Sequence, residues 1–180
     1  MLRLLIFSII VLTSVISGQQ PGHCPNIPGL SRNIYRAPGI WYVHSKSTND
    51  FDEKMKCVRI NWSQPKGSNF TLTVENFSTI TNTLESIVVE GRDGSPTFRC
   101  HVPVLGEIDV DYYILGHDYA RWAILYYCDE KENSYTEQAL VLTRQKFPDE
   151  RGLNQFIDQS YRYWGLQKPQ FTPTVQNCRN

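Results

Sequence analysis

The residues of this chain with the clearest chemistry are five cysteines, at positions Cys24, Cys57, Cys100, Cys128 and Cys178. None of them forms the C-x-x-C spacing that zinc sites and thioredoxin-like motifs use. In an oxidising compartment four cysteines would join in two disulfides and one thiol would be left over. The spacing alone leaves several pairings open, so the sequence predicts two bridges and one free thiol without identifying them.

Motifs of the common enzyme classes are missing from the sequence. It contains no Ser/His/Asp arrangement, no glycine-rich phosphate loop and no H-E-x-x-H metal motif. The four histidines are scattered, without the ligand spacing of a zinc site, at His23, His44, His101 and His117. We therefore expect no catalytic residues, no metal and no cofactor, and we expect His117 to be a loop residue.

The charge balance disfavours two classes of partner. Lysine and arginine number 18, and aspartate and glutamate also number 18, so the formal net charge is zero. A nucleic-acid-binding protein needs a basic face that neutralises phosphates, and an anionic membrane surface attracts runs of basic residues. Neither pattern occurs, so we expect no nucleic-acid partner.

The first residues have the pattern of a secretory signal peptide. Arg3 supplies a positive start, residues 4–16 are almost wholly apolar, and Ser17 and Gly18 are small. The apolar run is short for a membrane span, although an N-terminal anchor is the alternative, and no later stretch reaches about 20 apolar residues. We expect a signal peptide at residues 1–18, one domain over residues 19–180, and a secreted, extracellular protein that is not transmembrane.

The elements that must position these residues are mostly β-strands. Val58, Ile60 and Trp62 alternate with polar neighbours, and the run over residues 70–74 does the same. Turn signals follow each run, for example at Asp93-Gly94. Further runs lie at residues 84–90, 97–102, 112–115, 122–128 and 138–143. With the first strand near residue 39, roughly eight strands predict an antiparallel sandwich or barrel.

Three acceptor tripeptides for N-glycosylation lie on these runs, at Asn61, Asn69 and Asn76. A glycan on Asn61 must face solvent, which turns its neighbours Ile60 and Trp62 inward. Asn69 orients its own run in the same way, so glycosylation and hydrophobic alternation select the same inner face. Asn76 has inward parity, so it must lie past the strand end or beyond a bulge if it is modified.

One helix is expected near the C-terminal end, at about residues 149–164. Proline and acidic residues at positions 148–150 suit a helix N-terminus. Gly165 suits its end. An apolar stripe at three- and four-residue spacing follows from Leu153, Phe156, Ile157, Tyr161 and Trp164. A closed barrel with one amphipathic helix packed outside accounts for the whole pattern.

Three short motifs in this order resemble those of the lipocalin family. Gly39 and Trp41 begin the first strand, Asp118 and Tyr119 follow a later strand, and Arg144 directly ends the last apolar run. The resemblance implies an eight-stranded up-and-down β-barrel, closed at one end by Trp41 with the Arg144 guanidinium packed across its indole.

The resemblance is greatest to apolipoprotein D and the bilin-binding proteins, because of Cys24-Pro25-Asn26, the motif order and the cysteine near the C-terminus. In one respect the chain departs from the family, which often has a tyrosine two residues before the motif glycine. Here Tyr35 lies four residues before Gly39. The resemblance implies disulfides Cys24–Cys128 and Cys57–Cys178, which would leave Cys100 unpaired.

By this resemblance the protein is expected to bind and transport a small hydrophobic ligand: a lipid, retinoid, steroid, pheromone or tetrapyrrole. The expected lining residues are the inward members of three strands, with tyrosines from residues 112–127 adding hydrogen bonds: Val58, Ile60, Trp62, Phe70, Leu72, Val74, Phe98, Cys100 and Val102. Two alternatives stay open. One is an enzyme that uses Cys100 as a nucleophile in the cavity, and the other is a lipocalin whose partner is a protein such as a cell-surface receptor.

Overall fold

The computed structural model describes residues 19–47, 55–102 and 106–178. The expected signal peptide lies outside these residues. The elements are β1 (Gln19–Pro21), β2 (Gly39–Ser47), β3 (Met55–Trp62), β4 (Asn69–Ser78), β5 (Thr83–Arg92), β6 (Thr97–Val102), β7 (Gly106–Asp111), β8 (Tyr113–Asp118), β9 (Trp122–Lys131), β10 (Ser134–Thr143), α1 (Glu150–Trp164) and β11 (Phe171–Pro173).

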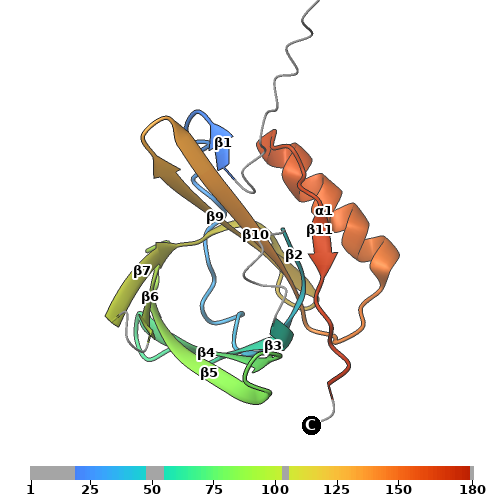
Figure 1. Cartoon of the computed structure of the whole chain (residues 1–180). Helices are drawn as coiled ribbons and strands as arrows, with labels where there is room; N and C mark the ends of the chain where they lie inside the picture. Colours follow the sequence, from blue (N-terminus) through green and yellow to red (C-terminus); the bar gives the residue numbers. More distant parts are fainter. Residues whose placement is uncertain (1–18, 48–54, 103–105, 179–180) are drawn as a thin grey trace, which may run out of the picture.

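The strands form one antiparallel sheet that curls round on itself (Figure 1). Its strand order is β7-β6-β5-β4-β3-β2-β10-β9-β8, with β1 added beside β10 and β11 beside β2. The two ends of this path, β7 and β8, are consecutive in the chain and are separated only by Tyr112. The chain itself therefore joins the two ends of the sheet and makes the barrel.

The prediction of an antiparallel barrel with one C-terminal helix is confirmed, with a difference in the strand count. The backbone N–H of Tyr112 donates to the Pro96 carbonyl at 3.0 Å, outside the ladder, and this interruption divides one wall strand into β7 and β8. Counting these two as one strand, and leaving out the short added strands β1 and β11, gives the expected eight. Strand β7 was not predicted from the sequence, although Ile108 and Val110 alternate with acidic residues there.

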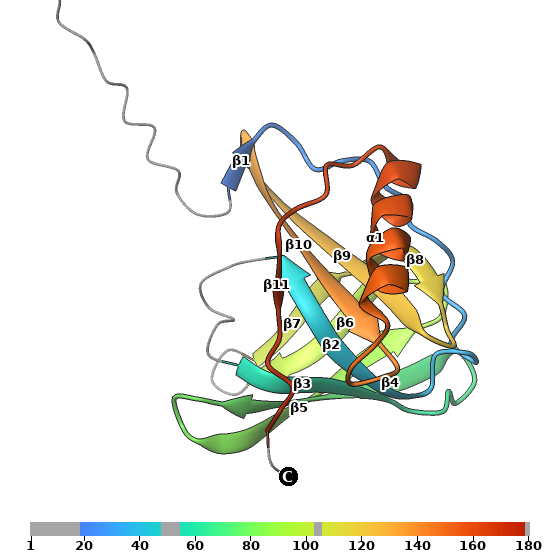
Figure 2. The same cartoon turned by 90° about the vertical axis from the view of Figure 1, so that its right-hand side faces the viewer.

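Helix α1 packs against the outside of the barrel (Figure 2). Asp149 is its N-cap, because the carboxylate accepts hydrogen bonds from the backbone N–H groups of Arg151 and Gly152. Gly165 ends it in the left-handed conformation, with φ of 66°. The helix buries Leu153 against the outer faces of β8 to β10, and the Trp164 indole N–H donates to the Leu115 carbonyl at 2.7 Å.

Strand β2 contains a β-bulge that changes which side chains face the barrel interior. Val43 is opposite Leu142, but Ser45 is opposite Val141, so β2 has one more residue than β10 between these pairs. An extra residue reverses the alternation beyond it. As a result Lys46, rather than Ser45, lines the interior together with Val43.

The C-terminal segment fills the region where β2 and β3 separate. Their pairing covers Gly39 to Tyr42 of β2, and further along the strand β11 takes the place of β3 beside β2 (Figure 2). The Gln176 side-chain amide then donates to the carbonyls of Val43 and Val58 at 2.9 and 3.0 Å. The wall is thereby completed by a segment that is more than a hundred residues distant in sequence.

Candidate ligand-binding cavity

A cavity of about 310 Å³ lies inside the barrel. All but two of the fifteen described residues that line it are hydrophobic, and they come from eight strands and the Tyr112 junction: Val43, Lys46, Val58, Ile60, Leu72, Val74, Ile87, Val89, Phe98, Cys100, Val110, Tyr112, Leu125, Gln138 and Leu140. Ligand pockets in proteins are typically about 300–1,000 Å³ and mostly apolar. This cavity is at the small end of that range.

Six of the nine expected lining residues line this cavity, namely Val58, Ile60, Leu72, Val74, Phe98 and Cys100. Trp62 and Phe70 point inward as expected, but they do not line it. Their rings pack 5.0 Å apart, and each also contacts the ring of Phe98, so together they fill the closed end of the barrel. The side chain of Val102 lies outside the described residues.

Two polar residues that line the cavity, Lys46 and Gln138, were not predicted from the sequence. Lys46 is 8% exposed. Among the described residues that line the cavity, it is also the only charged one. Strict alternation from Trp41 assigns it to the outer face, and only the bulge after Val43 turns it inward. Gln138 shares the inner face of β10 with Leu140, the register partner of Lys46, so the two polar side chains are diagonal neighbours on one wall.

Trp41 and Arg144 close one end of the barrel. The indole is 1% exposed and its N–H donates to the Ala37 carbonyl at 2.8 Å. The Arg144 guanidinium lies 3.9 Å from the ring centroid. It also donates to the carbonyls of Tyr119 and Ile40 at 3.1 and 3.2 Å, and burial lowers its pKa. This arrangement places a cation over an aromatic face in a partly desolvated site.

The other three motif residues lie at the same end. Gly39 has φ of 103°, and an added Cβ would lie 3.2 Å from Nη1 of Arg144. The Asp118 carboxylate accepts from the backbone N–H of Ala120 at 3.1 Å and caps the turn after β8. The Tyr119 hydroxyl accepts from the Asn33 backbone N–H at 2.7 Å, which holds the segment before β2 across the barrel end.

Arg32 also lies at the closed end, and nothing in the sequence pattern indicated it. Its guanidinium carbon is 4.3 Å from the centroid of the Phe98 ring. The side chain of Phe98 also forms part of the cavity lining. Burial lowers the pKa of Arg32 to about 10, so it is still a cation at neutral pH. Its Nε and Nη1 atoms are buried without a hydrogen-bond partner among the described residues.

Cys100 is the free cysteine, and its environment favours the protonated thiol. Its Sγ donates to the Ile108 carbonyl at 3.5 Å, and burial, followed by the charges of Glu107 and Asp109, raises its pKa. A thiol acts as a nucleophile through its thiolate, so a raised pKa lowers its reactivity near neutral pH.

We expect iodoacetamide at pH 7.5 to alkylate Cys100 at least about tenfold more slowly in the folded protein than in denaturant, because burial limits both ionisation and access. Intact-mass spectrometry over time measures both rates. Equal rates in the two states would contradict this expectation and would favour the reactive-thiol alternative.

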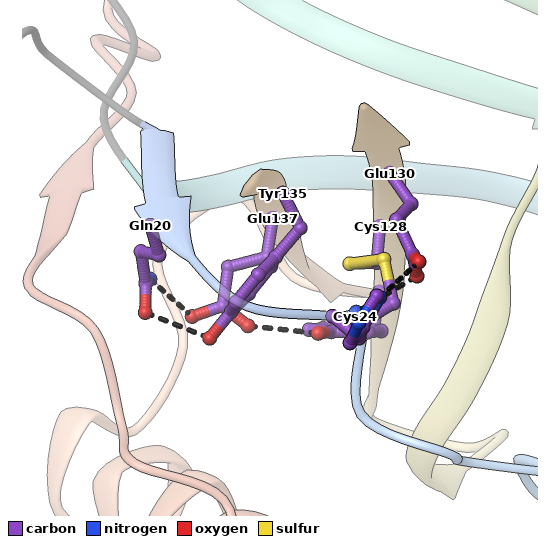
Figure 3. The surroundings of a disulfide bond; sticks show 8 residues. Gln20, Cys24, Cys128, Glu130, Tyr135 and Glu137 are labelled. Atoms are coloured by element: carbon purple, nitrogen blue, oxygen red, sulfur yellow. Dashed lines mark hydrogen bonds and ion pairs between the residues drawn. A yellow bond between two sulfur atoms is a disulfide. The ribbon is translucent and has the colours of Figure 1, made fainter. Parts of the chain in front are cut away.

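The other four cysteines form the disulfides Cys24–Cys128 and Cys57–Cys178, the pairs that the resemblance implies. Figure 3 shows the first of them beside polar contacts that hold the N-terminal segment on the barrel. The Cys24 backbone N–H donates to the Glu130 carboxylate at 3.1 Å. Gln20 links to Glu137 at 3.0 Å and to the Tyr135 hydroxyl at 2.8 Å. Sequence-distant segments are thereby fixed to β9 and β10.

The structure separates the three glycosylation tripeptides. Asn61 and Asn69 are exposed on the outer surface, as expected. Asn76 is only 9% exposed, and its Nδ2, the atom to which a glycan would attach, is buried. It lies within β4 rather than past its end. The prediction of a glycan at Asn76 is therefore incompatible with the folded structure.

Two other kinds of site have no basis in the part of the chain that the structure describes. No group of three or more His, Cys, Asp or Glu residues could hold a metal ion there. His117 stacks on Tyr119 with ring centroids 4.4 Å apart, and burial lowers its pKa. No described helix is long and apolar enough to cross a membrane.

Comparison with solved structures shows that the chain shares the lipocalin fold. Lobster apocrustacyanin A1 is similar over 91% of this chain and 94% of its own, with 18% identity and a TM-score of 0.72. Insecticyanin from the tobacco hornworm Manduca sexta is similar over 87% of both chains, with 15% identity and a TM-score of 0.73. The amine-binding protein of Rhodnius prolixus, solved as its tryptamine complex, is similar over 82% of this chain and 83% of its own, with 14% identity and a TM-score of 0.62.

Comparison at the level of sequence identifies the family. No curated protein matches the chain. The model of the Triabin family matches residues 26–152, which include all of the barrel strands from β2 to β10. The apolipoprotein D branch stays a prediction. With a family match over most of its length and the lipocalin fold, the chain belongs to the Triabin family.

Proposed function

We propose that the protein is a secreted carrier that binds a small hydrophobic ligand inside the barrel. The observation that carries this proposal is the cavity, whose walls are hydrophobic at thirteen of fifteen positions. Transfer of apolar surface from water into such a site contributes about 25 cal/mol per Å² to binding. The similar amine-binding protein, solved with tryptamine, supports a role in binding small molecules.

The volume of the cavity limits the ligand. An engineered apolar cavity of roughly 150 Å³ accommodates benzene. At 310 Å³ this cavity is about twice as large, so a ligand of about a dozen non-hydrogen atoms matches it. Among the expected classes this favours short lipids and volatile pheromone-like molecules over a tetrapyrrole, whose four rings exceed the space.

Three further features support secretion. Disulfides persist in oxidising, extracellular compartments, and the chain has two of them. The exposed Asn61 and Asn69 are available for glycosylation, and the pattern over residues 1–18 is that of a signal peptide. The raised pKa of Cys100 supports a carrier over an enzyme.

Replacing Leu72 with tryptophan is expected to reduce the affinity for a small apolar fluorescent probe at least about tenfold, because the larger side chain occupies the cavity that Leu72 lines. Probe titration measures the affinity. The matched control is Val88→Trp, which adds a tryptophan at a 55% exposed position on the neighbouring strand.

Equal probe binding by both variants would contradict the carrier proposal. Organic extraction of protein purified from its source, followed by mass spectrometry, then identifies the natural ligand. If the protein instead acts by binding another protein, Leu72→Trp is expected to leave that interaction unchanged.

A further inference from the structure

Two polar side chains beside the cavity have no hydrogen-bond partner among the described residues. Gln138 lines the cavity from β10, and Tyr127 is directly opposite it on β9. Neither the Gln138 amide nor the Tyr127 hydroxyl bonds to another group in the described part of the chain. Facing residues on adjacent antiparallel strands have Cβ atoms about 5 Å apart. Both polar groups can therefore meet the same end of a ligand.

Tyr127 lies on the inner face of β9. Leu125, two residues earlier on the same regular ladder, lines the cavity, and residues two apart in a strand share a face. The centroid of the Tyr127 ring is 5.8 Å from that of Tyr112, which also lines the cavity. Burial, followed by the charge of Asp129, raises the pKa of Tyr127, so its hydroxyl stays protonated at neutral pH.

The inner face of this wall becomes wholly apolar toward the closed end of the barrel. Along β10, Leu140 and Leu142 follow Gln138 in that direction. Leu125, which is opposite Leu140 on β9, is apolar as well. A ligand with one polar end and one apolar end is therefore oriented by this wall, with its apolar part toward the closed end.

A charged ligand end finds no free opposite charge among the described lining residues. Lys46 already makes an interaction within the protein, and no described aspartate or glutamate lines the cavity. Burying an ionised group without a paired charge is costly, whereas an uncharged polar group needs only hydrogen bonds. The groups that are free on this wall are the uncharged amide and hydroxyl.

A ligand that fills the cavity displaces water from Gln138 and Tyr127. The amide offers N–H donors and a carbonyl acceptor, and the phenol O–H can donate or accept. If the ligand lacks a polar group here, both side chains lose their bonds to water and gain none in return. Sites of this kind reject analogues that lack the matching hydroxyl or carbonyl.

We propose that the ligand is a small apolar molecule with an uncharged oxygen at one end, a hydroxyl or a carbonyl, and that Gln138 and Tyr127 bond to this oxygen. The apolar walls bind the rest of the molecule. The inference rests on the proposed carrier function and names the groups that select the polar end of the ligand.

The experiment compares four probes of similar size that differ at one end: 4-phenylbutan-1-ol, pentylbenzene, 4-phenylbutanoate and 4-phenylbutylamine. Displacement of a fluorescent probe gives each affinity at pH 7, where the carboxylate is ionised and the amine is protonated. We expect the alcohol to bind at least about tenfold more tightly than either charged probe, because neither charge is paired in the cavity.

Two variants remove the polar groups and keep much of the side-chain shape: Gln138→Leu and Tyr127→Phe. Pentylbenzene is the more hydrophobic molecule, so the readout is the ratio of the alcohol affinity to the pentylbenzene affinity. We expect this ratio to fall about tenfold in Gln138→Leu and about threefold in Tyr127→Phe. Retained pentylbenzene binding also shows that a variant is folded.

The matched controls make the same changes at exposed positions outside the cavity. Gln64→Leu alters the turn after β3, and Tyr163→Phe alters a helix residue that is 74% exposed. Both are expected to leave the ratio unchanged.

The outcomes separate the two proposals. If either charged probe binds the wild-type protein more tightly than the alcohol, or if the ratio is the same in the wild type and in both cavity variants, the inference is wrong while the carrier function stands. If none of the four probes binds, the carrier function itself is overturned. Should Gln138→Leu fail to fold, Tyr127→Phe decides the inference by the same ratio.

Discussion

Replacing Trp41 with alanine is expected to lower the free energy of unfolding by about 3–5 kcal/mol. The indole is almost fully buried inside the barrel, among the residues of the interior core. Its removal leaves a void that the rigid strands cannot close. It also removes the ring over which the Arg144 guanidinium lies at 3.9 Å. Equilibrium unfolding in guanidinium chloride, with the disulfides intact, measures the change.

Two variants serve as controls for Trp41. Trp41→Phe keeps an aromatic ring beneath Arg144 but loses the N–H bond to the Ala37 carbonyl, so we expect a smaller loss of about 1–2 kcal/mol. Ile40→Ala changes the neighbouring side chain, which is 44% exposed, and is expected to cost less than about 1 kcal/mol. A Trp41→Ala variant no less stable than Ile40→Ala would show that the indole does not stabilise the closed end.

Removing the Cys57–Cys178 bridge by two serine substitutions is expected to lower the free energy of unfolding by about 2–5 kcal/mol. The bridge closes a loop with a sequence separation of 121 residues, so its loss restores much chain entropy to the unfolded state. It also holds the segment whose Gln176 amide bonds to β2 and β3. Guanidinium unfolding without reductant measures the loss.

The control for this bridge is Cys100→Ser, which makes the same chemical change and leaves both disulfides in place. We expect it to cost less than about 1 kcal/mol, because the thiol makes only a long hydrogen bond. Hydrogen exchange gives a second readout. The backbone N–H at position 57, which donates to the Val175 carbonyl at 2.7 Å, should exchange faster only in the double variant, where the residue is serine. Unchanged stability and exchange would show that the segment is held by its hydrogen bonds alone.

The barrel strands and the outer helix were predictable because their signals are local. Hydrophobic alternation identified the inner faces of β3 and β4, with Ile60 and Leu72 in the cavity wall. The N-terminal acids and Gly165 marked the ends of α1 within a residue. Alternation shows which face of the sheet a side chain lies on, but it does not show how deep along the barrel axis that side chain lies. For that reason Trp62 and Phe70 were expected to line the cavity, whereas they fill the closed end of the barrel.

What the sequence by itself determined is the antiparallel β class, the single helix and the inward faces of the regular strands, since each follows from periodicity along a short segment. The tertiary structure decided that β7 and β8 are parts of one wall and that Asn76 is buried. It also decided that Lys46 faces the cavity. Strand register depends on hydrogen bonds between segments that are distant in sequence, and one extra residue against β10 is enough to reverse a face. The chemistry of the cavity therefore depends on register, which no single segment encodes.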